Sequence, residues 1–370
     1  MQSSVMQKLT TKENVVMCGD GRCDSPGHCA KYGTYSLMEC ESGCVVAFSV
    51  CTTANPNIKN SNAMEPMGLR NCLEEVKKAK IDVGILSTDR HVTIRKILRT
   101  EYPEIIHQFD VWHLVKSITK RLCALAKAKG TAVLSEWITS ITNHFWWSAM
   151  SCNGDVDLLR EKWESLIYHA AGIHSWKDKQ IFHACEHAPL TDCNTKWLKV
   201  GSAAHDALTK VVKDKNLIRD LTHVTMFCHT GEMEVHVYHS LLLKYVPKRQ
   251  HFSYEGMVCR TQLAAIDHNY HAGRQQATNQ KTGEPMFNIV YPKCNKYNKK
   301  WVAKCMKVPK DCTYREDLMK EVLAMRERNL EKSRAVLHAV KPNLAPIERP
   351  RDKDEVIRKT KQYTRFAPKL

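Results

Sequence analysis

The first 110 residues begin with three short apolar runs. Residues 14–20 ("NVVMCGD") form an apolar run that ends on an acid, residues 34–40 ("TYSLMEC") alternate, and residues 44–50 ("CVVAFSV") are typical of a buried strand. The short "ESG" between the last two runs suits a hairpin turn. The pattern therefore predicts three strands, of which the second and third pair antiparallel.

Helices and strands then alternate. Residues 63–79 carry apolar side chains at helical spacing, and residues 91–102 predict a second helix that closes before Pro103. Residues 81–89 ("IDVGILSTD") and 104–110 ("EIIHQFD") are strand-like, which gives the order β, β, β, α, β, α, β. This order predicts an α/β fold with a mixed sheet flanked by helices.

From residue 112 to about residue 227 the pattern changes to helices only. The segments are "HLVKSITKRLCALAKAKG", "AVLSEWITSITNHFWWSAM", "VDLLREKWESLIYHAAGIHSW" and "KWLKVGSAAHDALTKVVKD". Tryptophans gather in this region and are predicted to form a helix-packing core: Trp137, Trp146, Trp147, Trp163 and Trp176. We therefore predict an all-α insertion.

The last third returns to isolated helices. Residues 231–246 predict a helix that begins with acids, as the positive end of its dipole favours, and residues 315–340 predict another. The Pro- and charge-rich end is expected to be a mostly disordered basic tail. The predicted organisation is a first part of the core at 1–113, the insertion at 114–227, the completion of the core with a basic segment at 228–340, and the tail at 341–370.

Charge points to a polyanionic partner. Lys plus Arg number 56 against 39 Asp plus Glu, a formal net charge of +17, and DNA is the first candidate. Residues 293–315 carry eight Lys or Arg against one Asp and include aromatic residues, a composition that suits phosphate contacts as well as a solvated loop. The candidate DNA contacts there are Lys296, Lys299, Lys300, Lys304 and Lys307.

A membrane is not expected as a partner, because no run approaches the ~18 apolar residues of a spanning helix. The N-terminus lacks the apolar core of a signal peptide, so a cytosolic or nuclear location is predicted. The 16 Cys residues are then expected to be mostly reduced thiols. Two groups are candidate zinc ligands, although their spacings match no standard finger: Cys18, Cys23 and Cys29, and His183, Cys185 and His187 in "HACEH".

Acids follow the predicted strands. Asp20 ends the first strand with Asp24 just behind it, Asp89 ends the fourth, and Asp110 follows the fifth. If the first and fourth strands are adjacent, these acids converge on one edge, where carboxylates suit Mg²⁺ or Mn²⁺. Two such ions can support phosphodiester cleavage. Taken singly, an Asp after a strand is more commonly a turn former or a helix N-cap, and only the combined order of the acids favours a metal site.

Several segments resemble one family. They are residues 19–39 ("GDGRCDSPGHCAKYGTYSLME"), "LSTDRH", "HQFDVWH", "HFWWSAMSCNGD", "HTGEMEVHVYHSLLLKYVPKR" and "RTQLAAIDHN". Their order and spacing resemble the transposase core of eukaryotic cut-and-paste DNA elements, in a group related to the hAT superfamily with its C/DxxH signature. The likeness extends from about residue 15 to about residue 328.

The resemblance implies an RNase H-like fold, interrupted by an all-α insertion, whose acidic triad cuts DNA with a two-metal site of Mg²⁺ or Mn²⁺. Carried over by position, the first acid falls on Asp20 or Asp24, and the second on Asp89. The third falls on Glu234, with Glu232 as the neighbouring alternative. The resemblance also implies a nuclear location and a homo-oligomer.

The C/DxxH signature falls on Asp110 and His113 in "DVWH". His113 could contact DNA, bind a metal or brace the edge of the site by hydrogen bonding. Trp112 beside it is expected to be a core residue rather than a platform for a DNA base.

The predicted first strand begins within about 15 residues of Met1, which leaves no room for the N-terminal DNA-binding domain that such transposases carry. A truncated copy is therefore expected. Two functions stay open. One is DNA strand cleavage and transfer by Asp20, Asp89 and Glu234. The alternative is a catalytically inactive, transposon-derived protein that binds DNA or a protein partner.

Overall fold

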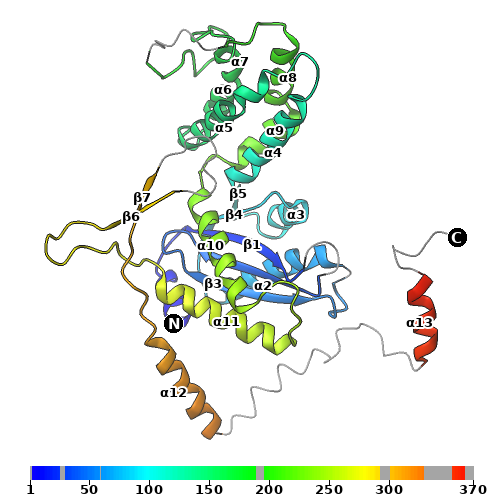
Figure 1. The fold of residues 1–370 in the computed structure, drawn as a ribbon, viewed down its shortest axis with the longest axis vertical. Helices are drawn as coiled ribbons and strands as arrows, with labels where there is room; N and C mark the ends of the chain where they lie inside the picture. Colours follow the sequence, from blue (N-terminus) through cyan, green and yellow to red (C-terminus); the bar gives the residue numbers. More distant parts are fainter. Residues whose placement is uncertain are drawn as a thin grey trace.

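The computed structural model describes residues 2–25, 30–58, 60–188, 196–291, 301–328 and 352–362, but not the side chains of residues 2–4, 229–234 and 359–362. A central sheet carries helices on both faces, and a helical insertion rises beyond one edge of the sheet (Figure 1). The segments that follow the last sheet-covering helix extend away from this body (Figure 1).

The central sheet has the strand order β3-β2-β1-β4-β5. β1 (Val15–Cys23) pairs antiparallel with β2 (Tyr32–Glu39), and β2 pairs antiparallel with β3 (Val45–Thr52). On its other side β1 pairs parallel with β4 (Val83–Thr88), which pairs parallel with β5 (Ile106–Phe109). The prediction of an α/β fold with a mixed sheet is confirmed, including the antiparallel second and third strands.

The first strand is longer than predicted. β1 continues to pair with β2 as far as Cys23 opposite Gly33, so Asp20 lies inside the strand and not at its end. The apolar run ends near residue 20, but the backbone pairing does not, because the hydrogen bonds of a ladder are independent of side-chain polarity.

One face of the sheet is covered by α1 (Gln2–Leu9), α2 (Met64–Lys78) and α3 (Val92–Glu101). Their apolar side chains pack with Met17, Leu37 and Leu86 of the sheet. The helix at α1 was not predicted. Gly68 lets α2 approach closely, because a Cβ at this position would lie 2.5 Å from the Cβ of Tyr35.

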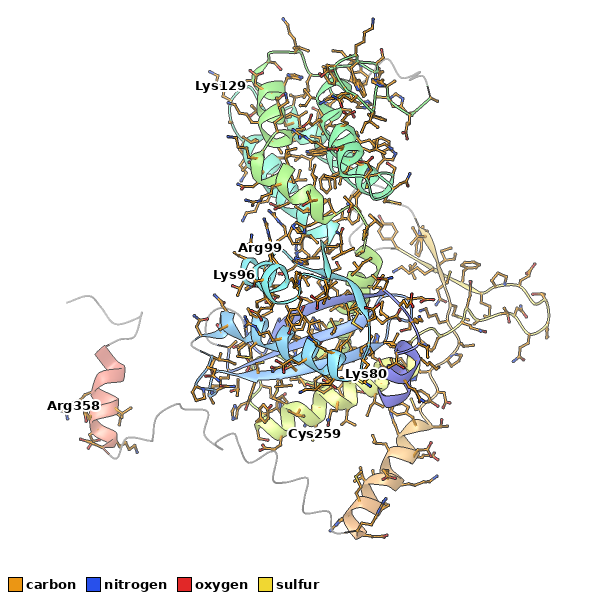
Figure 2. The ribbon with its side chains drawn as sticks, turned by 180° about the vertical axis from the view of Figure 1, so that it is seen from behind. Lys80, Lys96, Arg99, Lys129, Cys259 and Arg358 are labelled. Carbon is orange, nitrogen blue, oxygen red and sulfur yellow. The ribbon has the colours of Figure 1, made fainter. Side chains whose placement is uncertain are left out.

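α3 illustrates how patterning orients these helices. Ile94, Ile97 and Leu98 are buried against the sheet, which leaves the opposite side of the helix to charged residues. Figure 2, seen from behind, shows Lys96 and Arg99 on this exposed side.

The opposite face is covered by α10 (His229–Tyr245) and α11 (Tyr254–His271) (Figure 1). Val235, Tyr238 and Leu242 of α10 pack in the same buried cluster as Cys18 of β1. Arg22 of β1 donates a hydrogen bond of 2.5 Å to the carbonyl of Val246, which anchors the end of α10 on the sheet. The helix at α11 was not predicted.

The insertion follows β5 directly and packs around its own core. Trp163 is fully buried and donates a hydrogen bond of 3.1 Å to the carbonyl of Val212, while Trp137 and Trp176 are 7% exposed. The predicted tryptophan core is therefore largely present. The helices are α4 (Val111–Leu125), α5 (Leu134–Met150), α6 (Val156–Glu164), α7 (Leu166–His169), α8 (Ala203–Val212) and α9 (Lys215–Asp220).

The prediction of helices only is wrong between α7 and α8. There the chain leaves the helical conformation and forms an isolated antiparallel bridge between Ser175 and Ala184. Gly172 explains the break, because its φ of 76° is a left-handed conformation that ends a helix readily.

The C-terminal part contains β6 (Phe287–Val290) and β7 (Val302–Cys305), which form a separate antiparallel pair. α12 (Tyr314–Glu327) matches the start of the helix predicted at 315–340, and residues 329–340 lie outside the described residues. The tail was predicted to be mostly disordered, but its described residues form α13 (Lys353–Gln362). None of the helices in the described part of the chain is long and apolar enough to cross a membrane.

A buried acid joins the insertion to the sheet. Asp220, at the end of α9, is 1% exposed and accepts hydrogen bonds from Arg90 and Arg95, the latter at 3.1 Å. Arg90 follows β4 and Arg95 lies on α3. Two guanidinium groups from the core thus hold the base of the insertion next to Asp89.

We expect Asp220→Ala to destabilise the protein by about 2–4 kcal/mol, because both guanidinium groups lose their acceptor at a partly buried junction. The midpoint of urea unfolding, followed by tryptophan fluorescence, measures the change. The control is Glu136→Ala. Glu136 pairs with Lys196 at the surface, where the side chains are 57% and 71% exposed, respectively. It should shift stability by less than about 0.5 kcal/mol. Equal effects of the two variants would contradict a joining role for Asp220.

Candidate active site

Strand register brings three aspartates to one level of the sheet. The parallel pairs Cys18↔Ser87 and Thr88↔Phe109 set the register of β1 with β4 and of β4 with β5. Continuing this register places Asp20 level with Asp89, and Asp89 level with Asp110. A hydrogen bond of 3.1 Å from the Asp110 N–H to the Thr88 carbonyl supports the second alignment. The acids of three adjacent parallel strands therefore form one row.

Asp20 faces α10. Its neighbour two residues back, Cys18, is buried under α10, and alternate residues of a strand share a face. The Nδ1 atoms of His239 and His236 lie 3.3 Å and 3.8 Å from Asp20 Oδ2, and the Gly21 N–H donates to Asp20 Oδ1 at 2.8 Å. Burial alone would raise the pKa of Asp20, but the hydrogen bond from His239, the charges of both histidines and the Gly21 N–H hold it below its usual range.

His239 is itself held in place, since its Nε2 lies 3.2 Å from the hydroxyl of Ser36 on β2. A buried serine on one side and Asp20 on the other fix the imidazole between them. Neither His236 nor His239 was predicted as a site residue, although both occur in "EVHVYHS" at helical positions three apart.

Asp89 lies just past the end of β4 and accepts a hydrogen bond of 2.9 Å from the backbone N–H of His91. Burial and the charge of Asp20 raise the pKa of Asp89, against the N–H of His91 and the charge of His113. This influence of Asp20 on the pKa of Asp89 supports the closeness that the register indicates. A cation between them would relieve this repulsion.

Asp110 is the N-cap of α4 and is fully buried. Its Oδ1 accepts a hydrogen bond of 3.0 Å from the N–H of Trp112, so the helix-cap interpretation of this residue is confirmed. Its other oxygen lies 4.0 Å from Nε2 of His113. Asp110 therefore both starts the insertion and contributes to the row of acids.

Asp110, His113 and His236 also form a group whose ligand atoms all lie within 4.8 Å of one another. Nε2 of His236 is buried and has no hydrogen-bond partner among the described residues. An unpartnered imidazole nitrogen beside a carboxylate is a feature that a cation would satisfy. Of the roles predicted for His113, metal binding and bracing of the site both agree with this geometry.

Glu65 lies at the same level on the other face of the sheet, and the sequence did not predict it. It stands in the first turn of α2, over Gly21, where a Cβ would come within 2.5 Å of Glu65 Cγ. Burial, followed by the charges of Asp89 and Asp20, raises the pKa of Glu65 to about 8. The only sequence signal was an acid near a helix start, which many helices share.

Asp24 takes the turn-forming role. Its Oδ1 accepts hydrogen bonds from the Lys31 N–H at 3.1 Å and from the Ser25 hydroxyl at 3.2 Å, beyond the end of β1. The geometry thus favours Asp20 over Asp24 as the first acid. The side chains of Glu232 and Glu234 lie outside the described residues, although α10 includes both positions.

The predicted DNA-contacting lysines are only partly described. Lys304, on β7, and Lys307 are exposed, whereas Lys296, Lys299 and Lys300 lie outside the described residues. Trp112 differs from the prediction of a core residue, because it is 36% exposed and Lys116 Nζ lies 3.9 Å from the centre of its ring. In the first turn of α4 it stands at the rim of the site, with its ring 5.5 Å from that of His236.

The raised pKa of Glu65 predicts a pH-dependent stability. Between its ordinary value of 4.5 and its folded value of about 8, the folded chain keeps a proton that the unfolded chain has lost. The stabilisation is therefore complete below about pH 4.5 and is lost as the pH rises towards 8. In the presence of EDTA, the Tm of Glu65→Gln should equal that of wild type at pH 5 and exceed it by a few degrees at pH 8.5. Equal destabilisation at both pH values would contradict this, and Glu136→Gln, at an exposed position, is the control.

The possible donor atoms at this edge of the sheet are carboxylate oxygens and imidazole nitrogens. Asp110, His113 and His236 bring theirs within 4.8 Å of one another, and the carboxylates of Asp20 and Asp89 lie at the same level of the sheet. Oxygen ligands suit Mg²⁺ and Mn²⁺, and the added imidazoles favour Mn²⁺ over Mg²⁺. The chain matches no known protein-family model and no curated protein, so its function is inferred from the chemistry of these side chains.

Proposed function

We propose that this chain is a transposase-like DNA-cleaving and strand-transferring protein built on an RNase H-like core. The observation that carries the proposal is the row of Asp20, Asp89 and Asp110 on three adjacent parallel strands, faced by α10. The strand order β3-β2-β1-β4-β5, with β5 followed by a helical insertion and then by a helix that returns to the sheet, supports the fold assignment. Nuclear DNA is the proposed substrate.

The residues present fit a divalent cation. Asp20 and Asp89 offer hard oxygens, and the charge of Asp20 raises the pKa of Asp89. His236 offers a buried nitrogen with no partner among the described residues. Mn²⁺ or Mg²⁺ bound there would neutralise the charge that develops on the phosphate during in-line displacement. Asp20 and Asp89 would hold the ions, with Glu234 or Glu232 as the third carboxylate.

The surrounding side chains have supporting tasks in this proposal. His239 orients Asp20 through the Ser36 contact, and the N-cap bond of Asp110 keeps its carboxylate fixed at the start of α4. Glu65 lies on the other face of the sheet, where burial and the charges of Asp89 and Asp20 raise its pKa to about 8 and so limit the negative charge behind the row of acids.

Trp112 and Lys116 offer a contact for unpaired DNA. A tryptophan that is 36% exposed and carries a lysine ammonium over its ring can stack with a base while the ammonium meets the backbone. The net charge of +17 adds long-range attraction for DNA. The proposed substrate therefore includes a single-stranded stretch beside the scissile phosphate.

One observation favours the second function, a catalytically inactive DNA-binding protein. The described side chains of α10 that face Asp20 are His236 and His239, at a place where a DNA-cleaving triad needs its third carboxylate. If neither Glu232 nor Glu234 reaches the cations, the site would hold metal and DNA without cutting.

The cleavage test uses the purified full chain, labelled DNA with a single-stranded branch, and Mn²⁺, Mg²⁺ or EDTA. We expect metal-dependent cleavage that falls at least ~100-fold in Asp89→Asn, because a metal ligand is lost while the side-chain shape is kept. Asp24→Asn, in the turn, should stay within a few-fold of wild type.

Glu234→Gln and Glu232→Gln assign the third acid in the same assay, since only the ligand should abolish cleavage. If wild type binds DNA in a salt-dependent manner but never cleaves it, the enzyme proposal fails and the second function stands. If Asp24→Asn is inactive and Asp20→Asn is active, the assignment of the first acid is wrong.

The Trp112 contact gives a separate prediction. Trp112→Ala should weaken binding of single-stranded DNA by about 1–3 kcal/mol, and Trp112→Phe should restore most of the affinity because the ring can still stack. Fluorescence anisotropy with single-stranded and fully duplex oligonucleotides measures both. An equal loss on duplex DNA would argue against base stacking.

A further inference from the structure

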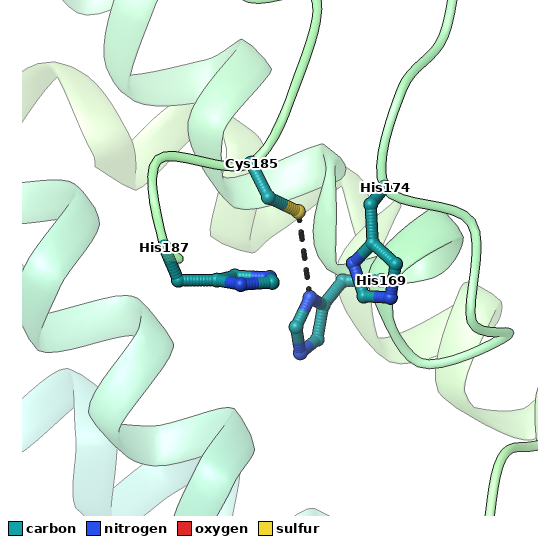
Figure 3. Close-up of side chains that lie close together, drawn as sticks. All are labelled: His169, His174, Cys185 and His187. Carbon is teal, nitrogen blue, oxygen red and sulfur yellow. Dashed lines mark hydrogen bonds between the residues drawn. The ribbon is translucent and has the colours of Figure 1, made fainter. Parts of the chain in front are cut away.

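A second group of metal-ligating side chains lies in the insertion, away from the row of acids. His169, His174, Cys185 and His187 converge so that one ligand atom from each lies within 4.8 Å of all the others. Figure 3 shows the three imidazoles and the thiol turned towards a common space. None of these four residues belongs to the candidate active site described above.

The distances match a tetrahedral zinc site. Nδ1 of His169 lies 3.4 Å from Sγ of Cys185. Zinc bonds of about 2.3 Å to sulfur and about 2.0–2.1 Å to nitrogen, at tetrahedral angles, would separate these two atoms by about 3.5 Å. A lone thiol–imidazole hydrogen bond explains this pair, but it does not explain why two further imidazoles meet at the same place.

The ring arrangement supports a shared ligand. The ring centres of His169, His174 and His187 are 5.0–5.2 Å apart in all three pairs, with interplanar angles of 77–88°. Three imidazoles that point at one tetrahedral zinc would have their ring centres about 5 Å apart. The three rings are therefore arranged around a common centre and are not stacked on one another.

The unused hydrogen-bonding atoms are consistent with this interpretation. Nδ1 of His174 is buried and has no hydrogen-bond partner among the described residues. Nδ1 of His187 lies 2.7 Å from the carbonyl of Ala188, which fixes that nitrogen as the donor and leaves Nε2 for a ligand.

The local fold explains how distant residues meet. The N–H of Cys185 donates to the carbonyl of His174 at 2.9 Å, beside the bridge of Ser175 with Ala184, so a narrow hairpin holds these two ligands together. His169 is the last residue of α7. Trp197 covers the group, with its ring 5.8 Å from that of His169 and 5.4 Å from that of His174.

We propose that His169, His174, Cys185 and His187 bind one structural zinc ion that fastens the segment between α7 and α8 to the insertion. Four protein ligands complete a tetrahedral shell, which leaves no position for substrate and so indicates a structural role. Binding releases the proton of the Cys185 thiol. Of the group predicted in "HACEH", Cys185 and His187 lie in the cluster, whereas His183 is exposed and lies outside it; His169 and His174 were not predicted.

The other predicted cysteine group does not form such a site. Cys18 packs under α10, whereas Cys23 packs with Ile58 and Met64 in a different buried cluster. Cys29 lies outside the described residues. The cluster in the insertion is thus the stronger candidate for zinc.

The first test is the metal content of the full chain after purification with zinc. We expect about one zinc ion per chain held by this site, and its loss in Cys185→Ser and in His187→Ala. His183→Ala and Cys123→Ser are matched controls, an exposed histidine of the same hairpin and an exposed cysteine of α4, and both should keep the metal. Circular dichroism verifies that each variant is folded.

A cobalt titration of chelator-treated wild-type protein needs no variant to fold. Co²⁺ should give the visible absorption of a tetrahedral site together with a thiolate charge-transfer band, and Cys185→Ser should lack that band. Hydrogen exchange should show that chelation loosens residues 166–188 and leaves the central sheet protected.

Two results would overturn the proposal. One is a chain that takes up neither zinc nor cobalt. The other is metal that remains at full level in Cys185→Ser and is lost in His113→Ala, because that metal would lie with Asp110 and His236 at the edge of the sheet. DNA cleavage plays no part in either readout, so the zinc proposal stands or falls independently of the proposed function.

Discussion

The parallel register of β1, β4 and β5 is the constraint on which the site depends. Met17 and Leu86 are fully buried on the α2 face, and Cys18 and Ser87 are fully buried on the other face. Because side chains alternate with a period of two, a slip of one residue in either pairing would exchange these faces. The core thereby fixes the register, and the register keeps Asp20, Asp89 and Asp110 at one level. Hydrophobic burial, and not any attraction between the acids, assembles the carboxylates.

Assembling like charges costs free energy, and the structure offsets the cost in three ways. Histidines 236 and 239 stand against Asp20, backbone N–H groups hold Asp89 and Asp110, and burial among carboxylates keeps a proton on Glu65. These interactions offset the charge of each acid separately, but the pKa of Asp89 remains raised. A cation bound among these carboxylates would relieve the repulsion that contributes to the raised pKa of Asp89.

Elements with a regular hydrophobic period were predicted from the sequence, and features without such a period were missed. The strands of the sheet and α2 and α3 follow from alternation and helical spacing, so they were predicted closely. α11 was missed because its buried positions include Thr261, Asp267 and His268, polar residues that find partners only in the folded chain. Glu65 has no signal beyond its helix start. Of the proposed zinc ligands, Cys185 and His187 were predicted. His169 and His174 were missed, since they meet Cys185 only through the turn and hairpin that follow α7.

The two candidate metal sites differ in donor atoms, and this difference has a physical consequence for the whole protein. The row of acids offers mainly carboxylate oxygen, whereas the insertion offers thiolate and imidazole, so each group discriminates against the other's ion by ligand type rather than by total affinity. Their locations also differ: the row of acids lies at one edge of the central sheet, and the Cys–His group lies inside a segment with little secondary structure of its own. The insertion meets the core through Asp220 and its two arginines, next to Asp89. A firmly folded insertion would therefore help to hold the strand end that carries the second acid.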